Sequence, residues 1–162
     1  GFGSMTDREP QRLLQMVLDG VEQAGVRAVL LRGWADLETA ALPSSVFPVR
    51  DVPHSWLFPR MAAVVHHGGA GTTAAGLRAG VPSLLVPFFA DQHFWARRVG
   101  ELGAGPATVT RKRLTVSKLA AGLKTVGSDL AMQQRAAAIG EQIRAEDGVN
   151  TAVALIQKAF QM

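Results

Sequence analysis

Apolar residues along this chain fall into two kinds of pattern: short continuous runs, and longer segments with an apolar residue at every third or fourth position. The short runs predict strands: AVLL (28–31), VFPV (46–49), AAVV (62–65), the start of SLLVPFF (83–89) and ATVT (107–110). The periodic segments predict helices at residues 11–23, 73–79, 91–102, 114–126, 129–144 and 149–160. Short buried strands that alternate with helices indicate a parallel sheet covered on both faces, which is a doubly wound α/β fold.

The composition is that of one folded domain. The chain has 162 residues, of which 48% are hydrophobic and 19% charged, and we expect residues 1–162 to form a single domain. The absence of cysteine excludes disulfides and is compatible with a reducing cytoplasm, so we expect a cytoplasmic protein. A net charge of +4 weakly favours anionic ligands, but the basic residues are too dispersed to indicate nucleic-acid binding.

Residues 66–73, HHGGAGTT, lie where a predicted strand gives way to a predicted helix. Glycine lets the backbone approach a ligand closely, and the first turn of a helix presents unpaired N–H groups to an anion. Threonine hydroxyls and a histidine add further donors. This combination favours a phosphate or diphosphate site over the alternative, in which the glycines only allow a tight turn and the histidine only packs.

Other ligands fit these histidines poorly. HHGGAGTT has neither the lysine of a Walker A motif nor the spacing of GxGxxG. His66 and His67 are consecutive in a predicted strand and point to opposite faces, so a shared metal ion is not expected. His54 and His93 stand at no recognisable ligand spacing. We therefore expect no metal site.

Two further loops follow predicted strands and contain candidate ligand-binding residues. In PFFADQHFW (87–95), Asp91 and Gln92 stand where a helix begins. Asp91 either caps that helix or joins Gln92 in binding sugar hydroxyls, and the pattern leaves both readings open. In RGWADL (32–37), Trp34 either packs in the core or lies along a ligand.

These motifs together resemble a known family. Residues 52–106, with GFGSM (1–5) and RGWADL (32–37), are similar to the donor-binding half of nucleotide-sugar-dependent glycosyltransferases with the GT-B fold. Within that superfamily the motifs most resemble sterol glucosyltransferases and bacterial enzymes that glycosylate macrolides, glycopeptides and other lipophilic natural products. The resemblance implies the Rossmann-like form of the doubly wound fold.

The resemblance also implies roles for individual residues. The donor diphosphate would be bound by His67, Gly69, Ala70, Gly71 and Thr72, with Ser4 close to it. Asp91 and Gln92 would bind the transferred sugar, Val52 would meet the nucleobase through its backbone, and Trp34 would line the same cleft. The family's catalytic base is a histidine of the N-terminal domain, so no residue of this chain is expected to be catalytic.

The expected partner of this chain is an N-terminal, acceptor-binding domain. GFGSM resembles the turn after the first strand of the family's C-terminal domain, so we expect that strand and the acceptor domain to be missing from this chain. On that view the chain binds the donor but does not complete a reaction alone.

The implied reaction is an inverting transfer of a hexose from UDP-glucose to a hydroxyl of a lipophilic acceptor, without a cofactor or metal, and with peripheral membrane contact as an option. Plant relatives carry a glutamate where this chain has Ala75, so the choice between UDP and dTDP stays open. The alternative is a module that retains the fold but only binds a nucleotide or an anionic lipid.

Overall fold

Two pairs of parallel strands form the centre of the molecule. The computed structural model describes residues 1–3, 5, 7–31 and 42–160. One pair is β1 (Ala28–Leu31) with β2 (Val46–Val49), and the other is β3 (Val64–His66) with β4 (Ser83–Leu85). In the second pair Val64 lies opposite Ser83 and His66 opposite Leu85, so both strands end at the same edge.

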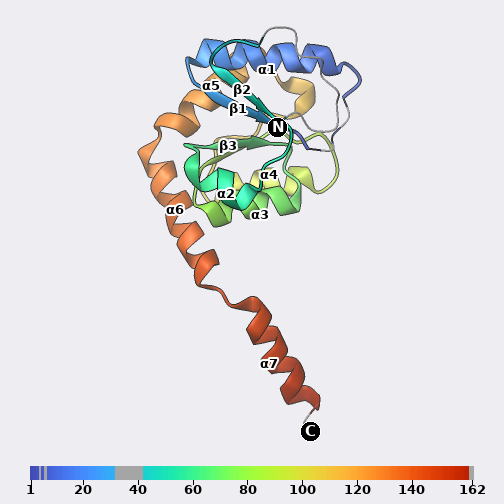
Figure 1. Ribbon diagram of the computed structural model, residues 1–162, viewed down its shortest axis with the longest axis vertical. Helices are drawn as coiled ribbons and strands as arrows, with labels where there is room; N and C mark the ends of the chain where they lie inside the picture. The colour runs from blue at the N-terminus through green and yellow to red at the C-terminus, as the bar shows by residue number, and fades with distance from the viewer. Residues whose placement is uncertain (4, 6, 32–41, 161–162) are drawn as a thin grey trace.

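Helices lie on both sides of the strands (Figure 1). Helices α1 (Pro10–Ala24) and α5 (Val116–Ser128) pack together on one side. On the other side lie α3 (Ala70–Ala79) and α4 (Gln92–Glu101), with the short α2 (His54–Leu57) beside them (Figure 1). The remaining helices are α6 (Leu130–Ala145), α7 (Gly148–Phe160) and the 3₁₀ turns η1 (Phe58–Arg60) and η2 (Arg111–Arg113).

Strand β4 shows why helices cover both faces. Leu84 packs in a core with residues of α1, α5 and α6, and its neighbour Leu85 packs in a second core with residues of α3 and α4. Successive residues of a strand point to opposite faces, so an all-apolar strand must be covered twice. The expected doubly wound α/β fold is confirmed.

Most of the predicted elements form within a few residues of their expected bounds, with two corrections. Residues 107–110 do not form a strand. The next residue, Arg111, donates its N–H to the carbonyl of Pro87, two residues after the end of β4, at 2.9 Å. The second correction is that α3 begins at Ala70 rather than at Thr73. The glycine-rich turn is therefore shorter, and Ala70, Gly71 and Thr72 form the first turn of the helix.

The first residue lies between the two strand pairs. The amino group of Gly1 donates to the carbonyl of Val65 in β3 at 3.1 Å. On its other side, a Cβ added to Gly1 would stand 2.8 Å from the carbonyl oxygen of Leu31 in β1. Among the described residues β1 and β3 are not paired with each other. A strand ahead of residue 1 stays a prediction.

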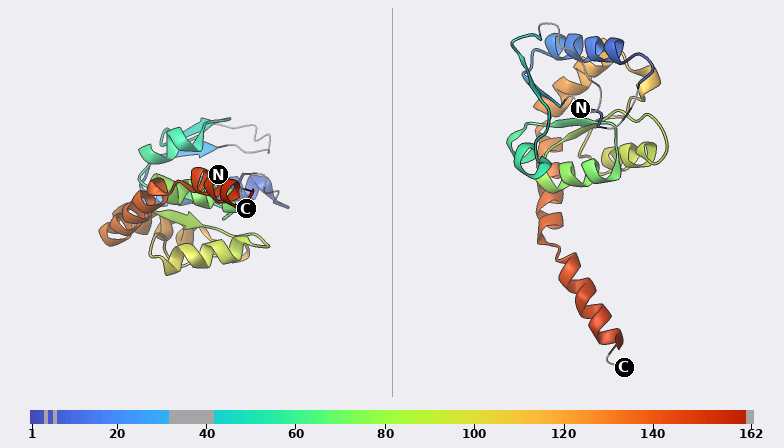
Figure 2. Two further views of the ribbon diagram at one scale, coloured as in Figure 1. Left: turned by 90° about the horizontal axis from the view of Figure 1, so that it is seen from below. Right: turned by 45° about the vertical axis from the view of Figure 1, so that its right-hand side comes forward.

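Helix α7 extends away from the rest of the molecule (Figures 1 and 2). It follows α6, and none of its residues is buried. In the described part of the chain no helix is long and apolar enough to cross a membrane.

Candidate functional site

Three turns come together at the edge where β3 and β4 end. They are the N-terminal turn (described residues 1–3, 5 and 7), the glycine turn (67–69) and the β4–α4 loop together with the first residue of α4 (86–92). The rings of Phe2 and Phe88 stand 5.5 Å apart, which joins the first turn to the third. A Cβ on Gly68 would lie 3.1 Å from the carbonyl oxygen of Gln92, which joins the second to the third.

The glycine turn leads the chain directly into α3. Gly68 has a φ of +94°, in the region that favours glycine, and a side chain there would also meet Leu85 at 3.3 Å. Gly69 is the N-cap and no side chain caps the helix. Among the described residues no side chain accepts a hydrogen bond from the N–H groups of the first turn of α3, and these groups carry the positive end of the helix dipole.

The two threonines of this turn differ in role. Thr73 is 1% exposed, and both its N–H and its hydroxyl donate to the carbonyl of Gly69 at 2.9 Å. Thr73 is thus part of the helix start and has no hydroxyl left for a ligand. Thr72 is half-buried, and a Cβ added at the neighbouring Gly71 would meet no atom of the described residues within 4 Å. A ligand can therefore approach the first turn of α3 at Gly71 and Thr72.

The imidazole of His67 lies between two glycines. A Cβ on Gly3 would stand 3.1 Å from its Cε1, and a Cβ on Gly69 would stand 2.6 Å from its Nε2. Its Nδ1 is buried and has no hydrogen-bond partner among the described residues. Burial lowers the pKa of His67, the N-terminal amino group lowers it further, and the carboxylate of Asp91 opposes both. His67 is therefore a neutral donor at neutral pH beside the start of α3.

His66 has a different environment from its neighbour. It is 2% exposed, and its Nδ1 accepts a hydrogen bond from the N–H of Gly68 at 3.0 Å. Burial lowers the pKa of His66 to about 3, with smaller contributions from the N-terminal amino group, His67 and His54. The two rings are nearly perpendicular, with centroids 6.4 Å apart. In the described part of the chain no group of three or more acidic or histidine side chains is arranged to hold a metal ion.

Asp91 and Gln92 lie at the start of α4 but point to different surroundings. Asp91 is exposed and its side chain makes no capping hydrogen bond; Oδ2 accepts from Nε1 of Trp95 at 3.1 Å instead. Gln92 is 4% exposed, and its Oε1 accepts from the N–H groups of Phe88 (2.8 Å) and Phe89 (3.3 Å). Asp91 therefore does not act as a helix cap, and Gln92 organises the β4–α4 loop.

The other predicted site residues are placed only in part. Val52 is half-buried and lies just before α2. Ala75 packs against a small core of Phe58, Val64 and Val81 on the buried side of α3. Ser4 and Trp34 lie outside the described residues.

One contact at this site was not predicted from the sequence. Nε of Arg111 donates to Oδ2 of Asp7 at 2.7 Å, and both side chains are more than four-fifths buried. Because the N–H of Arg111 also binds the carbonyl of Pro87, this ion pair ties the N-terminal turn to the end of β4. Only the spatial arrangement reveals it, since the two residues are 104 positions apart.

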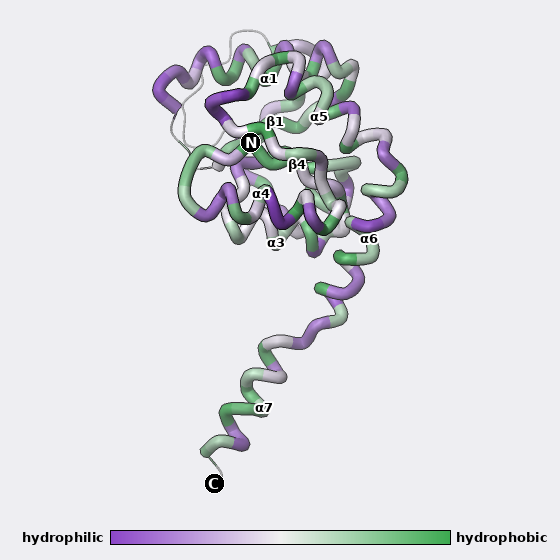
Figure 3. The backbone as a smooth tube through the Cα atoms, turned by 180° about the vertical axis from the view of Figure 1, so that it is seen from behind, coloured by the Kyte–Doolittle hydropathy of each residue, from purple (hydrophilic) through white to green (hydrophobic). Residues whose placement is uncertain are grey.

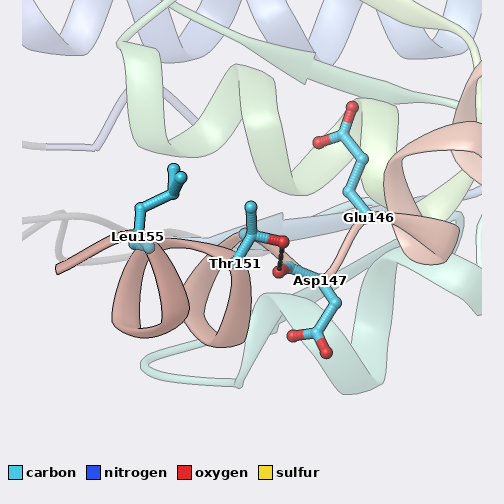
Figure 4. Close-up of a pocket in the computed structure, with 6 residues that line it drawn as sticks. Glu146, Asp147, Thr151 and Leu155 are labelled. Atoms are coloured by element: carbon cyan, nitrogen blue, oxygen red, sulfur yellow. Dashed lines mark hydrogen bonds between the residues drawn. The ribbon is translucent and has the colours of Figure 1, made fainter. Parts of the chain in front are cut away.

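A surface pocket elsewhere on the molecule has none of these features. It lies where α6 passes into α7 and is lined by Glu146, Asp147, Gly148, Thr151, Ala152 and Leu155 (Figure 4). The hydroxyl of Thr151 donates to the carbonyl of Asp147 at 2.7 Å, which is an ordinary bond of a helix start. We assign this pocket no function.

Comparison with known proteins identifies the family of this chain. Residues 17–157 match the model of the C-terminal domain of erythromycin biosynthesis protein CIII-like proteins. A sterol 3-beta-glucosyltransferase of Pichia angusta is 45% identical over 99% of this chain, and one of Arabidopsis thaliana is 41% identical over 94% of it. The chain spans 13% of the first of these relatives and 25% of the second.

Solved structures show the same fold. The spinosyn forosaminyltransferase SpnP superposes with a TM-score of 0.82 at 22% identity, over 96% of this chain and 40% of that one. The glycosyltransferase VinC in complex with dTDP superposes with a TM-score of 0.77 at 28% identity, over 92% of this chain and 38% of that one. The family match, the relatives and the fold agree: the chain belongs to the EryCIII-like C-terminal domains of GT-B glycosyltransferases.

Proposed function

We propose that this chain binds the nucleotide-sugar donor of a glycosyltransferase, with the diphosphate at the start of α3. The observation that carries this proposal is the uncapped first turn of α3, which follows Gly68 and lies beside His67. N–H groups at a helix start attract anions, and Thr72 and His67 add donors next to them. The complex of VinC with dTDP supports a nucleoside diphosphate as the ligand class.

The sugar of the donor lies beside Asp91 and Gln92 in this proposal. The carboxylate of Asp91 is exposed and can accept hydrogen bonds from sugar hydroxyls. The Oε1 of Gln92 is already bound by two backbone N–H groups, so Gln92 contributes its Nε2, which now donates to Sδ of Met5 at 3.2 Å. We propose UDP-glucose as the donor, because the relatives are named as glucosyltransferases.

The proposed reaction is an inverting transfer of the hexose to an acceptor hydroxyl. The oxygen of the acceptor attacks the anomeric carbon as the bond to the diphosphate breaks, and negative charge grows on the departing diphosphate. The N–H groups of α3, Thr72 and His67 stabilise that charge without a metal ion in this proposal. The base that removes the proton of the acceptor comes from an N-terminal acceptor domain, so this chain supplies donor binding rather than a catalytic residue.

The acceptor class follows from the relatives and not from this chain. The names of the relatives support a sterol, and those of the solved structures include enzymes that glycosylate other natural products. A lipophilic acceptor would bring the protein to a membrane surface from the cytoplasm, as a peripheral contact.

Calorimetry with UDP-glucose, UDP and uridine tests the proposal. We expect His67→Ala to weaken UDP by about tenfold, as loss of a hydrogen bond to a charged group does, and uridine by less than about twofold. His93→Ala is the matched control, because His93 is exposed on α4. A folded wild-type chain that does not bind UDP at millimolar concentration contradicts the proposal, and binding of anionic vesicles without UDP would favour the lipid-binding alternative.

A further inference from the structure

His66 has no part in the donor site proposed above, yet it makes a specific contact within it. Its Nδ1 accepts the N–H of Gly68, two residues further along the chain, in a buried environment. An asparagine makes the same bond through Oδ1 in an Asx turn, because Oδ1 and Nδ1 are both two bonds from Cβ. His66 thus has the role of the first residue in a turn of that type.

The bond matters because Gly68 is buried. Its Cα faces the backbone of Gln92 and the side chain of Leu85. A buried N–H without a partner costs about 1–3 kcal/mol, so the turn would rearrange if Nδ1 of His66 were removed. The residues that follow Gly68 are the cap of α3 and the first turn that faces the proposed diphosphate.

We propose that His66 is a positioning residue: by accepting the N–H of Gly68 it fixes the turn that presents the start of α3 and His67 to the diphosphate. The effect on diphosphate binding rests on the proposed function. The hydrogen bond between His66 and Gly68 in the free protein is independent of the proposed function.

The bond to Gly68 determines which nitrogen of the His66 ring carries the proton. An Nδ1 that accepts a hydrogen bond carries no proton, so the ring proton is on Nε2, which is buried and has no hydrogen-bond partner among the described residues. Burial is the main cause that lowers the pKa of His66, and the N-terminal amino group, His67 and His54 lower it further. Nothing in this environment favours a second proton, and the bond to Gly68 persists at physiological pH.

The first measurement concerns the free protein. Amide hydrogen exchange of Gly68, followed by NMR, is compared in the wild-type chain, His66→Asn and His66→Leu. We expect His66→Leu to speed exchange at Gly68 by at least about tenfold, and His66→Asn to stay within about threefold of wild type. Unchanged protection of Gly68 in His66→Leu would overturn the proposal.

The second measurement separates this inference from the proposed function. We expect His66→Leu to weaken UDP by about tenfold and uridine by less than about twofold, and His66→Asn to restore UDP binding. Equal losses for UDP and uridine, or no loss, would overturn the link to the diphosphate. If the wild-type chain itself does not bind UDP, the proposed function is wrong, and so is the inferred effect of His66 on diphosphate binding. The exchange data still test whether His66 holds the turn at Gly68.

A variant that fails to fold does not stop the test. His66→Gln keeps an amide but places its oxygen one bond further from the backbone than asparagine does. If His66→Leu is unfolded, His66→Gln and His66→Asn are compared at Gly68 and with UDP in the same way. Equal behaviour of these two variants would mean that polarity, and not the acceptor position, is what His66 supplies.

Discussion

The two histidines at positions 66 and 67 have opposite environments although they are neighbours. A strand directs consecutive side chains to opposite faces, which is why the sequence predicts that the two histidines diverge, but β3 ends at His66 and His67 is the first residue after it. The burial of each imidazole and its hydrogen bonds could not be predicted in this way. The bond from Gly68 to His66 depends on a left-handed glycine, and the position of His67 depends on Gly3, which is 64 residues away in the chain.

His67 makes donor binding depend on pH in a defined direction. Its pKa is below the ordinary value in the free protein, mainly through burial, and a bound diphosphate would raise it. Binding then takes up a proton, so the affinity for UDP-glucose rises as the pH falls through the bound-state pKa, and it levels off below the free-state pKa. The gain is about tenfold for each unit by which binding raises the pKa.

Calorimetry at several pH values checks this prediction. UDP-glucose is preferable to UDP, because its diphosphate has no terminal group that titrates near neutrality. We expect His67→Asn to remove the pH dependence and the exposed control His93→Asn to leave it intact. An affinity of the wild-type chain that does not change with pH would contradict the expected rise of the pKa of His67 on diphosphate binding.

Among the elements, the turn from β3 to α3 was only partly predictable. Residues 70–72 read as loop because glycine and alanine carry no apolar period, and the helix start becomes visible only through the bonds of Thr73 to Gly69. Gln92 was likewise assigned to the sugar alone, since no local pattern indicates that its Oε1 binds the loop before it. The strands β1 and β2 were predicted with their exact residues because each is a short, continuous apolar run, although β1 is only half-buried and Phe47 of β2 is exposed.

Alanine substitutions at Gly68 and Gly71 are expected to affect stability and ligand binding differently. Alanine at Gly68 needs a φ of +94° and contacts at 3.1–3.3 Å, so we expect it to lower the free energy of unfolding by about 2 kcal/mol. Alanine at Gly71 meets no atom within 4 Å and favours the helix, so stability should rise by up to about 1 kcal/mol. The same methyl group would stand where we place the diphosphate, and UDP affinity should fall.

Denaturant unfolding and calorimetry on both variants provide the measurements. The informative variant is Gly71→Ala, because it changes binding without harming the fold. Normal UDP affinity in a stable Gly71→Ala would show that the ligand does not approach the backbone of α3 at this point.

The ion pair of Asp7 and Arg111 joins the N-terminal turn to η2 and the end of β4. The guanidinium of Arg111 helps to lower the pKa of Asp7, against the opposing effect of burial. Removal of one partner leaves the other charge poorly solvated, so we expect Asp7→Asn to cost about 2 kcal/mol in unfolding free energy. The surface pair of Arg12 and Glu9, with side chains 72% and 60% exposed, is the matched control.

Denaturant unfolding of Asp7→Asn and Arg12→Ala at neutral pH tests this difference. We expect Arg12→Ala to change stability by at most about 0.5 kcal/mol, since exposed pairs contribute little. A lowered pKa of Asp7 stabilises the fold above the ordinary pKa of aspartate, and this contribution is lost as the pH falls through the lowered pKa, so the stability of Asp7→Asn should converge with that of wild type over this range. Equal effects of both variants would contradict a special role for Asp7.

For the molecule as a whole, α7 stands apart from the two cores. Both cores draw on α6, through Met132 on one side and Ala136 on the other, but neither includes a residue of α7. Apolar and polar segments alternate along α7 in Figure 3. Its exposed large apolar residues are Val149, Val153, Leu155, Ile156 and Phe160.

A truncation series tests whether the fold depends on α7. A chain that ends at Asp147 loses no buried residue that the structure describes, so its unfolding free energy should stay within about 0.5 kcal/mol of the full chain. A chain that ends at Gly127 loses Met132 and Ala136 from the two cores and should not fold. Since exposed apolar side chains promote association, the chain that ends at Asp147 should also be more monomeric than the full chain in light scattering. A large loss of stability on removal of α7 alone would mean that this helix packs against the domain in solution.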